Sequence, residues 1–189
     1  MNTPHSNSPS ALGTIDRRQF VAQLLAATPD ALVVTGLGSP TYDVYASGDK
    51  DRYFYLWGAM GGALPLGLGL ALAQPQRPVL VITGDGEQLM GMGALATAAA
   101  QQPANLSVVV LDNGHFGETG MQRSHSSLGT RLVDVAKACG IARAREVFQL
   151  PRSPRWPKTS RPARACSLPR FTSSKRTCPA PYRPATART

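Results

Sequence analysis

The chain has 189 residues, 42% of them hydrophobic, which gives room for one domain with a buried core and excludes a wholly disordered protein. Its formal net charge of +9 would suggest a nucleic-acid or membrane-surface partner. However, residues 1–150 hold 10 Lys and Arg against 11 Asp and Glu, whereas residues 151–189 hold the other 10 basic residues and no acidic one. The charge belongs to the C-terminal segment, so we expect neither nucleic acid nor membrane as a partner of the folded part.

The three cysteines form no CxxC pair, and a sparse, odd count is typical of a reducing compartment rather than of a disulfide framework or a zinc site. We therefore expect a cytoplasmic protein. The longest glycine-rich apolar run, residues 58–73, has 16 residues and is interrupted by Pro65, which makes it too short and too broken to span a membrane.

The N-terminal part divides into two segments. Residues 1–10 are polar and rich in Ser and Pro, and we expect a disordered lead-in there. Residues 16–27, "DRRQFVAQLLAA", faintly resemble a twin-arginine export signal, but the apolar stretch is short and contains Gln23. The spacing instead predicts a first helix, whose apolar face holds Phe20, Val21, Leu24 and Leu25.

Apolar runs and helical segments alternate along the next hundred residues. The pattern predicts, in order, a strand and loop at 31–39, a short strand within 53–60, a helix at 61–73, a strand at 79–83, a helix at 87–101, a strand at 106–112 and an amphipathic helix at 131–140. Apolar runs without polar alternation are typical of strands covered on both sides. The sequence therefore predicts an α/β domain over residues 11–148, with a parallel sheet and helices on both faces.

The composition changes abruptly near residue 146. Residues 151–189 hold 8 of the 16 prolines and many Arg, Ser and Thr, so we expect residues 149–189 to be a basic, irregular tail. Such a tail could bind nucleic acid or a Pro-recognising domain. We favour a shift of reading frame near residue 147, because the change falls where a parallel sheet should add further strands. The sheet would then be truncated at its C-terminal end.

The stretch "VLVITGDGEQL", residues 79–89, places one acidic residue between two glycines behind an apolar run. Asp-Gly often marks a hairpin, but helix-prone residues rather than a strand follow Gly86. The turn therefore leads from a strand into a helix, at the sheet edge where α/β folds bind their ligands.

A second stretch, "VVVLDNGHFGETG", has the same layout and ends its strand near Asn113. The 26 residues between Gly86 and Asn113 suffice for a helix and a returning parallel strand, which would bring Asp85 and Asn113 to one sheet edge. Oxygen ligands of this kind suit Mg²⁺, which often shares its coordination shell with phosphates. Glycines and a helix N-terminus favour the approach of a diphosphate. The sequence thus predicts a metal–diphosphate site.

Gly-Asp-Gly followed about 25 residues later by Asn resembles the signature of thiamin-diphosphate-dependent enzymes. The segments "LWGAMGGALPLGLGLAL", "GDGEQLMGMGALATAA" and "VVLDNGHFGETG" are most similar to the diphosphate-binding subunit or domain of sulfopyruvate and phosphonopyruvate decarboxylases. The resemblance covers roughly residues 15–145. It implies the thiamin-diphosphate-binding fold, with "TGLGS" at 35–39 as a further loop of the same crevice.

The resemblance also implies roles for individual residues. Asp85, the Asn113 side chain and the His115 backbone carbonyl would bind Mg²⁺. Met60 would hold the cofactor in its bent conformation, unless it is a plain core methionine, and the Gly58 carbonyl would accept a hydrogen bond from the pyrimidine amino group. The implied cofactor-binding residues are Gly58, Met60, Gly84, Asp85, Gly86, Glu87, Asn113, His115 and Phe116.

Glu87 departs from the family pattern, in which a small or hydroxyl residue is common. Its carboxylate should repel a diphosphate unless it points away, or it is simply a favourable acid in the first turn of a helix. His115 and His125 are candidate catalytic residues, because decarboxylation requires a proton for the product, although His125 could equally be a solvated loop residue.

The family's pyrimidine-activating glutamate belongs to a separate domain, so the resemblance implies a partner subunit that carries it. We expect a thiamin-diphosphate- and Mg²⁺-binding subunit of a hetero-oligomeric 2-oxo-acid decarboxylase, a lyase inactive alone. The alternative is a truncated, non-catalytic product of such a gene.

Overall fold

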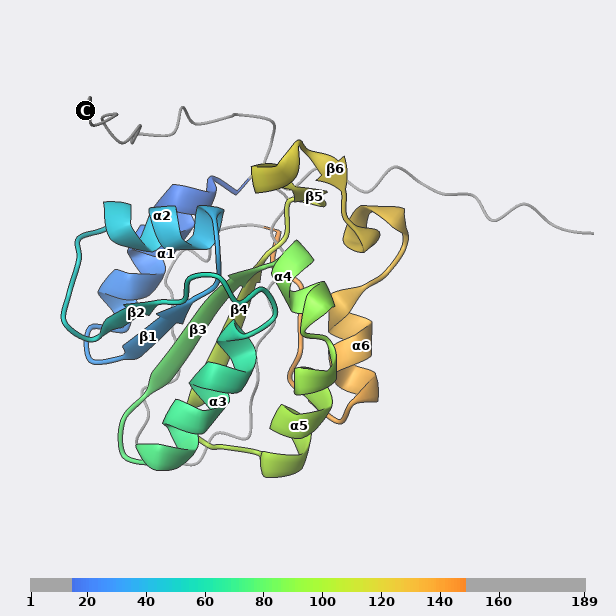
Figure 1. Ribbon diagram of the computed structural model, residues 1–189. Coiled ribbons are helices and arrows are strands. Elements are labelled where there is room, and N and C mark those ends of the chain that lie inside the picture. The colour runs from blue at the N-terminus through green and yellow to red at the C-terminus, as the bar shows by residue number, and fades with distance from the viewer. Residues whose placement is uncertain (1–14, 149–189) are drawn as a thin grey trace, which may run out of the picture.

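The computed structural model describes residues 15–148 (Figure 1). The lead-in expected at residues 1–10, the tail at 149–189 and any truncation of the sheet beyond residue 148 lie outside these residues. Within 15–148, the main sheet has four parallel strands in the order β2-β1-β3-β4. The strands are β1 Leu32–Thr35, β2 Tyr53–Tyr55, β3 Val79–Gly84 and β4 Leu106–Leu111.

Six α-helices accompany this sheet in the described part of the chain. They are α1 Arg17–Ala27, α2 Ser39–Ala46, α3 Ala63–Ala73, α4 Asp85–Met90, α5 Gly93–Gln101 and α6 Leu132–Ala138. A small antiparallel hairpin of β5 His115–Phe116 and β6 Gln122–Arg123 follows β4, with the 3₁₀ turns η1 Gly117–Thr119 and η2 His125–Leu128.

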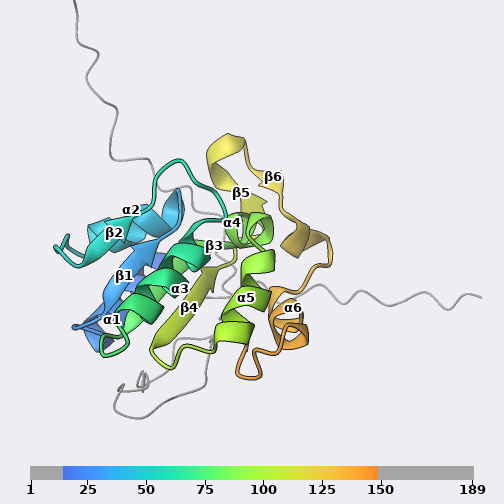
Figure 2. The same ribbon diagram turned by 60° about the horizontal axis from the view of Figure 1, so that its bottom comes forward.

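Helices cover both faces of the sheet (Figure 2), and an apolar core lies on each face. One face carries alternate strand residues such as Val34, Val81 and Val108, which pack with residues of α3, α5 and α6. The other face, with Val33 and Ile82 among its residues, packs with α1 and α2. The parallel sheet with helices on both faces, predicted from the unalternating apolar runs, is thus confirmed, and so is the buried face of α1.

The pairing of β3 with β4 determines where the two conspicuous turns lie. Gly84 is in register with Leu111, so both strands end at the same edge of the sheet. Asp85 follows the first of these residues directly, and Asn113 lies two residues beyond the second. The crossover predicted from the length of the connection therefore brings both turns to one edge, as expected.

The single helix predicted at 87–101 is wrong. The chain instead forms α4 and α5, with Gly91 as the C-cap of α4. Gly91 packs directly on the backbone of Gly61, where an added Cβ would lie 2.3 Å from the Gly61 carbonyl oxygen. A close backbone contact between distant segments therefore interrupts a helix that the local sequence favours.

Two features of the fold were not predicted. Helix α2 lies almost entirely in a stretch for which no element was predicted, and it begins after Gly38, which adopts a positive φ of 71°, with a Pro in its first turn. The β5–β6 hairpin, with two residues in each strand, was too short for a periodic signal. Among the helices of residues 15–148, none has the length and apolar character needed to cross a membrane.

Candidate functional site

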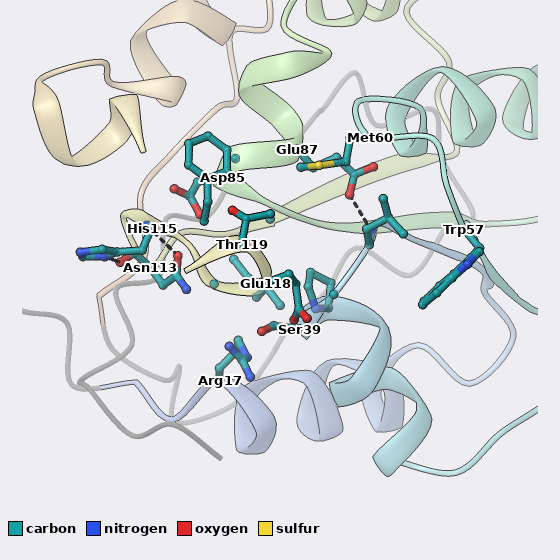
Figure 3. Close-up of a pocket in the computed structure, with 18 residues that line it drawn as sticks. Arg17, Ser39, Trp57, Met60, Asp85, Glu87, Asn113, His115, Glu118 and Thr119 are labelled. Atoms are coloured by element: carbon teal, nitrogen blue, oxygen red, sulfur yellow. Dashed lines mark hydrogen bonds between the residues drawn. The ribbon is translucent and has the colours of Figure 1, made fainter. Parts of the chain in front are cut away.

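A pocket with a volume of about 260 Å³ opens at the carboxyl ends of the strands (Figure 3). Its walls come from the β1–α2 loop, the segment between β2 and α3, the β3–α4 turn and the loop after β4. The pocket is lined by Arg17, Leu37, Gly38, Ser39, Pro40, Trp57, Met60, Gly84, Asp85, Gly86, Glu87, Leu111, Asn113, His115, Phe116, Gly117, Glu118 and Thr119. The "TGLGS" loop thus lies at the crevice, as predicted.

Asp85 is an acidic group of this pocket that is held by side-chain hydroxyls. Its side chain is buried, and one oxygen, Oδ2, accepts hydrogen bonds from the hydroxyls of Ser124 and Ser126. Ser126 also lies within hydrogen-bond distance, 2.8 Å, of Asp112 Oδ1. No hydrogen bond from residues 15–148 reaches the other oxygen of Asp85, Oδ1. The carboxylate is therefore held through one oxygen by two serines, and no motif or spacing had marked these serines as site residues.

The loop after β4 is shaped by hydrogen bonds within the Asp-Asn-Gly-His segment. Asp112 Oδ1 accepts from the Gly114 N–H at 3.0 Å, and Asn113 Oδ1 accepts from the His115 N–H at 2.9 Å. The imidazole Nδ1 of His115 lies 2.9 Å from the Asn113 carbonyl oxygen and donates to it in the tautomer that carries a proton there. Gly114 adopts a positive φ of 72°, which permits this tight turn. The turn brings Asn113 and His115 to the pocket wall beside Asp85 (Figure 3).

The available ligand atoms fit a hard cation. A carboxylate oxygen of Asp85 and the amide oxygen of Asn113 are the ligand types that Mg²⁺ prefers. Residues 15–148 contain no cluster of three or more His, Cys, Asp or Glu side chains that could hold a metal. The expected set has a different composition, because it combines one carboxylate, one amide and one backbone carbonyl.

Two glycines of the pocket lie directly against neighbouring side chains. An added Cβ on Gly86 would lie 2.5 Å from Cε1 of Phe116, so the ring of Phe116 packs directly on the turn. A Cβ on Gly38 would lie 2.9 Å from Cγ of Glu118. Both glycines line the pocket, and their lack of a side chain lets Phe116 and Glu118 pack this close to the backbone.

Glu87 is buried and its carboxylate turns toward the backbone of neighbouring loops (Figure 3). Oε2 accepts from the Leu37 N–H at 2.8 Å, and Oε1 accepts from the Ala63 N–H at 3.4 Å. Burial raises the pKa of this carboxyl above its ordinary value, while the neighbouring Thr83 hydroxyl and backbone N–H groups, including that of Leu37, act in the opposite direction. We expected the Glu87 carboxylate to point away from a diphosphate, and these contacts direct it toward the backbone of Leu37 and Ala63.

Seven further residues of the pocket were not predicted as site residues, namely Arg17, Pro40, Trp57, Leu111, Gly117, Glu118 and Thr119. Arg17 reaches the pocket from α1 and is paired with the fully buried Asp43, which also binds Arg18. No local pattern marks Arg17, because its position depends on the packing of α1 beside α2.

Of the predicted cofactor-binding residues, all but Gly58 line the pocket. Gly58 lies between Trp57 and Met60, which are both at the pocket wall. Of the two candidate catalytic histidines, His115 lines the pocket, whereas His125 is exposed at the start of η2 and is not among the lining residues. The geometry therefore supports a role in the pocket for His115 only.

The chain matches a family model described as "Thiamine pyrophosphate enzyme, C-terminal TPP binding domain" over residues 37–151. It is 42% identical over 127 residues to the sulfopyruvate decarboxylase subunit beta of Methanothermobacter thermautotrophicus, covering 67% of this chain and 68% of that protein. It is 44% identical over 137 residues to a phosphonopyruvate decarboxylase of Streptomyces hygroscopicus, covering 72% of this chain and 32% of that protein. The chain thus spans about a third of the length of the phosphonopyruvate decarboxylase.

The fold also matches solved structures. A thiamine diphosphate-dependent 4-hydroxybenzoylformate decarboxylase of Rhodococcus jostii RHA1 superposes with a TM-score of 0.70 at 24% identity, covering 92% of this chain and 35% of that chain. The benzoylformate decarboxylase of Polynucleobacter necessarius gives the same TM-score of 0.70 at 17% identity, over 88% of this chain and 34% of that chain. At these identities the likeness concerns the fold alone.

Proposed function

Because this chain belongs to the thiamine pyrophosphate enzyme family and contains its C-terminal TPP-binding domain, we propose that it is the diphosphate- and Mg²⁺-binding subunit of a 2-oxo-acid decarboxylase. The substrate would be a 2-oxo acid of the sulfopyruvate or phosphonopyruvate type. A second subunit would supply the pyrimidine-binding domain and its glutamate.

One observation carries this proposal. Asp85 and Asn113, which follow adjacent parallel strands, line one pocket together with Met60 from the opposite wall. This places a carboxylate and an amide oxygen at one side of the pocket and an apolar side chain at the other (Figure 3). A cofactor with a metal-bound diphosphate and an apolar ring system requires such a division.

In this proposal each residue has a limited task. Asp85, Asn113 and the His115 carbonyl bind Mg²⁺, and the backbone at Gly86 and Glu87 faces the diphosphate. Met60 supports the bent cofactor, while Gly84 and Phe116 complete the wall. Thiamin diphosphate, when bound, supplies the electron sink that the loss of CO₂ from a 2-oxo acid requires.

His115 is the residue proposed to handle a proton in the pocket. With its Nδ1–H donating to the Asn113 carbonyl, Nε2 is the ring nitrogen that takes or gives a proton. Decarboxylation of a 2-oxo acid to an aldehyde consumes one proton for each CO₂ released, so a proton donor near the reacting carbon is required.

The substrate class and the second subunit rest on the relatives. The proteins named sulfopyruvate and phosphonopyruvate decarboxylase act on 2-oxo acids, and the match of this chain to a protein named "subunit beta" over 68% of its length supports a two-subunit enzyme. We further propose residues 11–148 as the diphosphate-binding domain and a cytoplasmic location for the assembled enzyme.

The test is calorimetric titration of the full chain, mixed with a candidate pyrimidine-domain subunit, with thiamin diphosphate in the presence of Mg²⁺. We expect saturable heat that requires Mg²⁺ and disappears in Asp85→Ala. A soluble, monodisperse complex that gives no heat would overturn the cofactor assignment. Failure of the chain to form a soluble complex would favour a truncated, non-catalytic product instead.

A further inference from the structure

The carboxylate of Glu87 connects three walls of the pocket that lie far apart in the sequence. Glu87 itself belongs to the β3–α4 turn, Leu37 to the β1–α2 loop, and Ala63 to the start of α3. The Leu37 N–H donates to Oε2 at 2.8 Å and the Ala63 N–H to Oε1 at 3.4 Å. Ala63 follows Met60 by three residues, so this contact reaches the segment that carries Met60.

The chain leaves a space for this carboxylate. An added Cβ on Gly36 would lie 1.7 Å from Oε2 of Glu87 and 2.6 Å from Cδ. The φ angle of Gly36 is not among the positive values, so the reason for glycine here is steric rather than conformational. Gly36 and Glu87 are therefore a matched pair, because any larger side chain at position 36 would displace the carboxylate.

The contacts explain a buried acid that otherwise has no place in a diphosphate site. Glu87 is 3% exposed, so its carboxylate cannot be solvated by bulk water and depends on backbone N–H donors. Two of these donors belong to segments that carry pocket residues, namely Leu37 and Gly38 on one side and Met60 on the other. A carboxylate with two oxygens can hold both segments at once, which a small or hydroxyl residue cannot.

We infer that Glu87 is a positioning residue, whose carboxylate ties the loop at Leu37 to the segment between Met60 and α3 and so sets the distance across the cofactor pocket. It is not a diphosphate ligand through its side chain. This inference rests on the proposed function for what the pocket binds, but the contacts of Glu87 can be tested without any cofactor.

The first readout is amide hydrogen exchange of the cofactor-free full chain, resolved at Leu37 and Ala63 by NMR. Glu87→Gln keeps the volume but replaces one acceptor oxygen by an NH₂ group, which faces a backbone donor. We expect exchange at Leu37 or Ala63 to rise roughly tenfold or more, since a hydrogen bond to a charged group is lost or weakened. Glu146→Gln, which removes a carboxylate that pairs with Arg131, is the matched control and should leave both amides unchanged.

The second readout is thiamin diphosphate binding with Mg²⁺, for which a carboxylate that faces the diphosphate and a positioning carboxylate predict opposite signs. A carboxylate that faced the diphosphate would repel it, so Glu87→Gln would bind more tightly. A positioning carboxylate makes Glu87→Gln bind several-fold more weakly. Tighter binding, or unchanged exchange at both amides in Glu87→Gln, would overturn the inference.

A double-mutant cycle that combines Gly36→Ala with Glu87→Ala measures the coupling between the two positions and does not depend on the Glu87→Gln variant. Gly36→Ala alone should raise exchange at Leu37, because the new methyl group displaces the carboxylate. In the Glu87→Ala background the same change should add less, because only the contact of the methyl group with Thr83 Oγ1, at 2.7 Å, remains. Fully additive effects would contradict the pairing. If the wild-type chain binds no thiamin diphosphate, the proposed function fails, whereas the exchange data still decide the role of Glu87.

Discussion

The hydroxyl oxygen of Ser126 lies 3.0 Å from Oδ2 of Asp85, although 41 residues separate the two in the chain. The same hydroxyl lies 2.8 Å from Oδ1 of Asp112. One hydroxyl hydrogen stands between two buried carboxylates and can be donated to only one of them at a time. Ser126 belongs to η2, so this segment contacts Asp85, the proposed metal ligand, through a side-chain hydroxyl.

Ser126→Ala should destabilise the protein and weaken Mg²⁺-dependent thiamin diphosphate binding. The lost hydrogen bond to a buried carboxylate should cost about 1–3 kcal/mol of unfolding free energy, measured by urea denaturation. Ser127→Ala is the control, because its hydroxyl donates to the backbone carbonyl of Ser124 rather than to a carboxylate. An equal loss of cofactor affinity in the two variants would contradict this role of Ser126.

Met60→Ala should lower the activity of the reconstituted enzyme while leaving the thermal stability of the chain almost unchanged. Met60 is 41% exposed, so truncation of its side chain removes little buried area, and the thermal midpoint should change little. Activity of the reconstituted enzyme should fall by roughly tenfold or more, because a misplaced cofactor loses its alignment with the substrate. Met90→Ala, at a methionine that is 63% exposed and does not line the pocket, should leave activity unchanged.

The two glycines at positions 67 and 69 of α3 should respond in opposite directions to alanine. A Cβ on Gly67 would lie 2.1 Å from Cγ2 of Val81 in the sheet, whereas a Cβ on Gly69 meets no atom within 4 Å. Gly67→Ala should lose about 1–3 kcal/mol through overpacking. Gly69→Ala should gain up to about 1 kcal/mol through helix propensity. Urea denaturation measures the unfolding free energy of both variants. If Gly67→Ala were also stabilised, the prediction would be wrong and α3 would have to shift on the sheet to accommodate the methyl group.

Tyr55 should ionise at a higher pH than an ordinary tyrosine phenol. Burial raises the pKa of its phenol, and so does its hydrogen bond to Asp49, to which it donates at 2.8 Å. Because the folded pKa lies above the unfolded value near 10, the stabilisation is fully present below that value and is lost as pH rises through the folded pKa.

Spectrophotometric titration of tyrosinate, up to the pH at which the protein unfolds, checks this prediction. Tyr55→Phe should remove the latest component of the titration curve. Asp49→Asn should move that component to lower pH without restoring the ordinary value, because burial is the larger cause. A curve that is unchanged in Tyr55→Phe would contradict the assignment.

The amino-acid sequence alone determined the order of the strands and most helices along the chain, and the chemistry of the two turns. Unalternating apolar runs indicate strands covered on both faces, and this information is local. Gly84-Asp85-Gly86 and Asn113 could be selected because a strand, a helix and a returning strand require a known length of chain. The remaining cofactor-binding residues came from the resemblance to thiamin-diphosphate-dependent enzymes, and all but Gly58 of the expected set line the pocket.

Only the tertiary structure decided how these side chains are held. Asp85 is bound by Ser124, and Glu87 by the backbone of Leu37, across separations of 39 and 50 residues. The break between α4 and α5 depends on Gly91 meeting Gly61, and the presence of Arg17 in the pocket depends on the packing of α1. Periodicity reports which face of an element is buried, but hydrogen bonds and close contacts between distant segments form only when the chain has folded, because they depend on distances that no local pattern encodes.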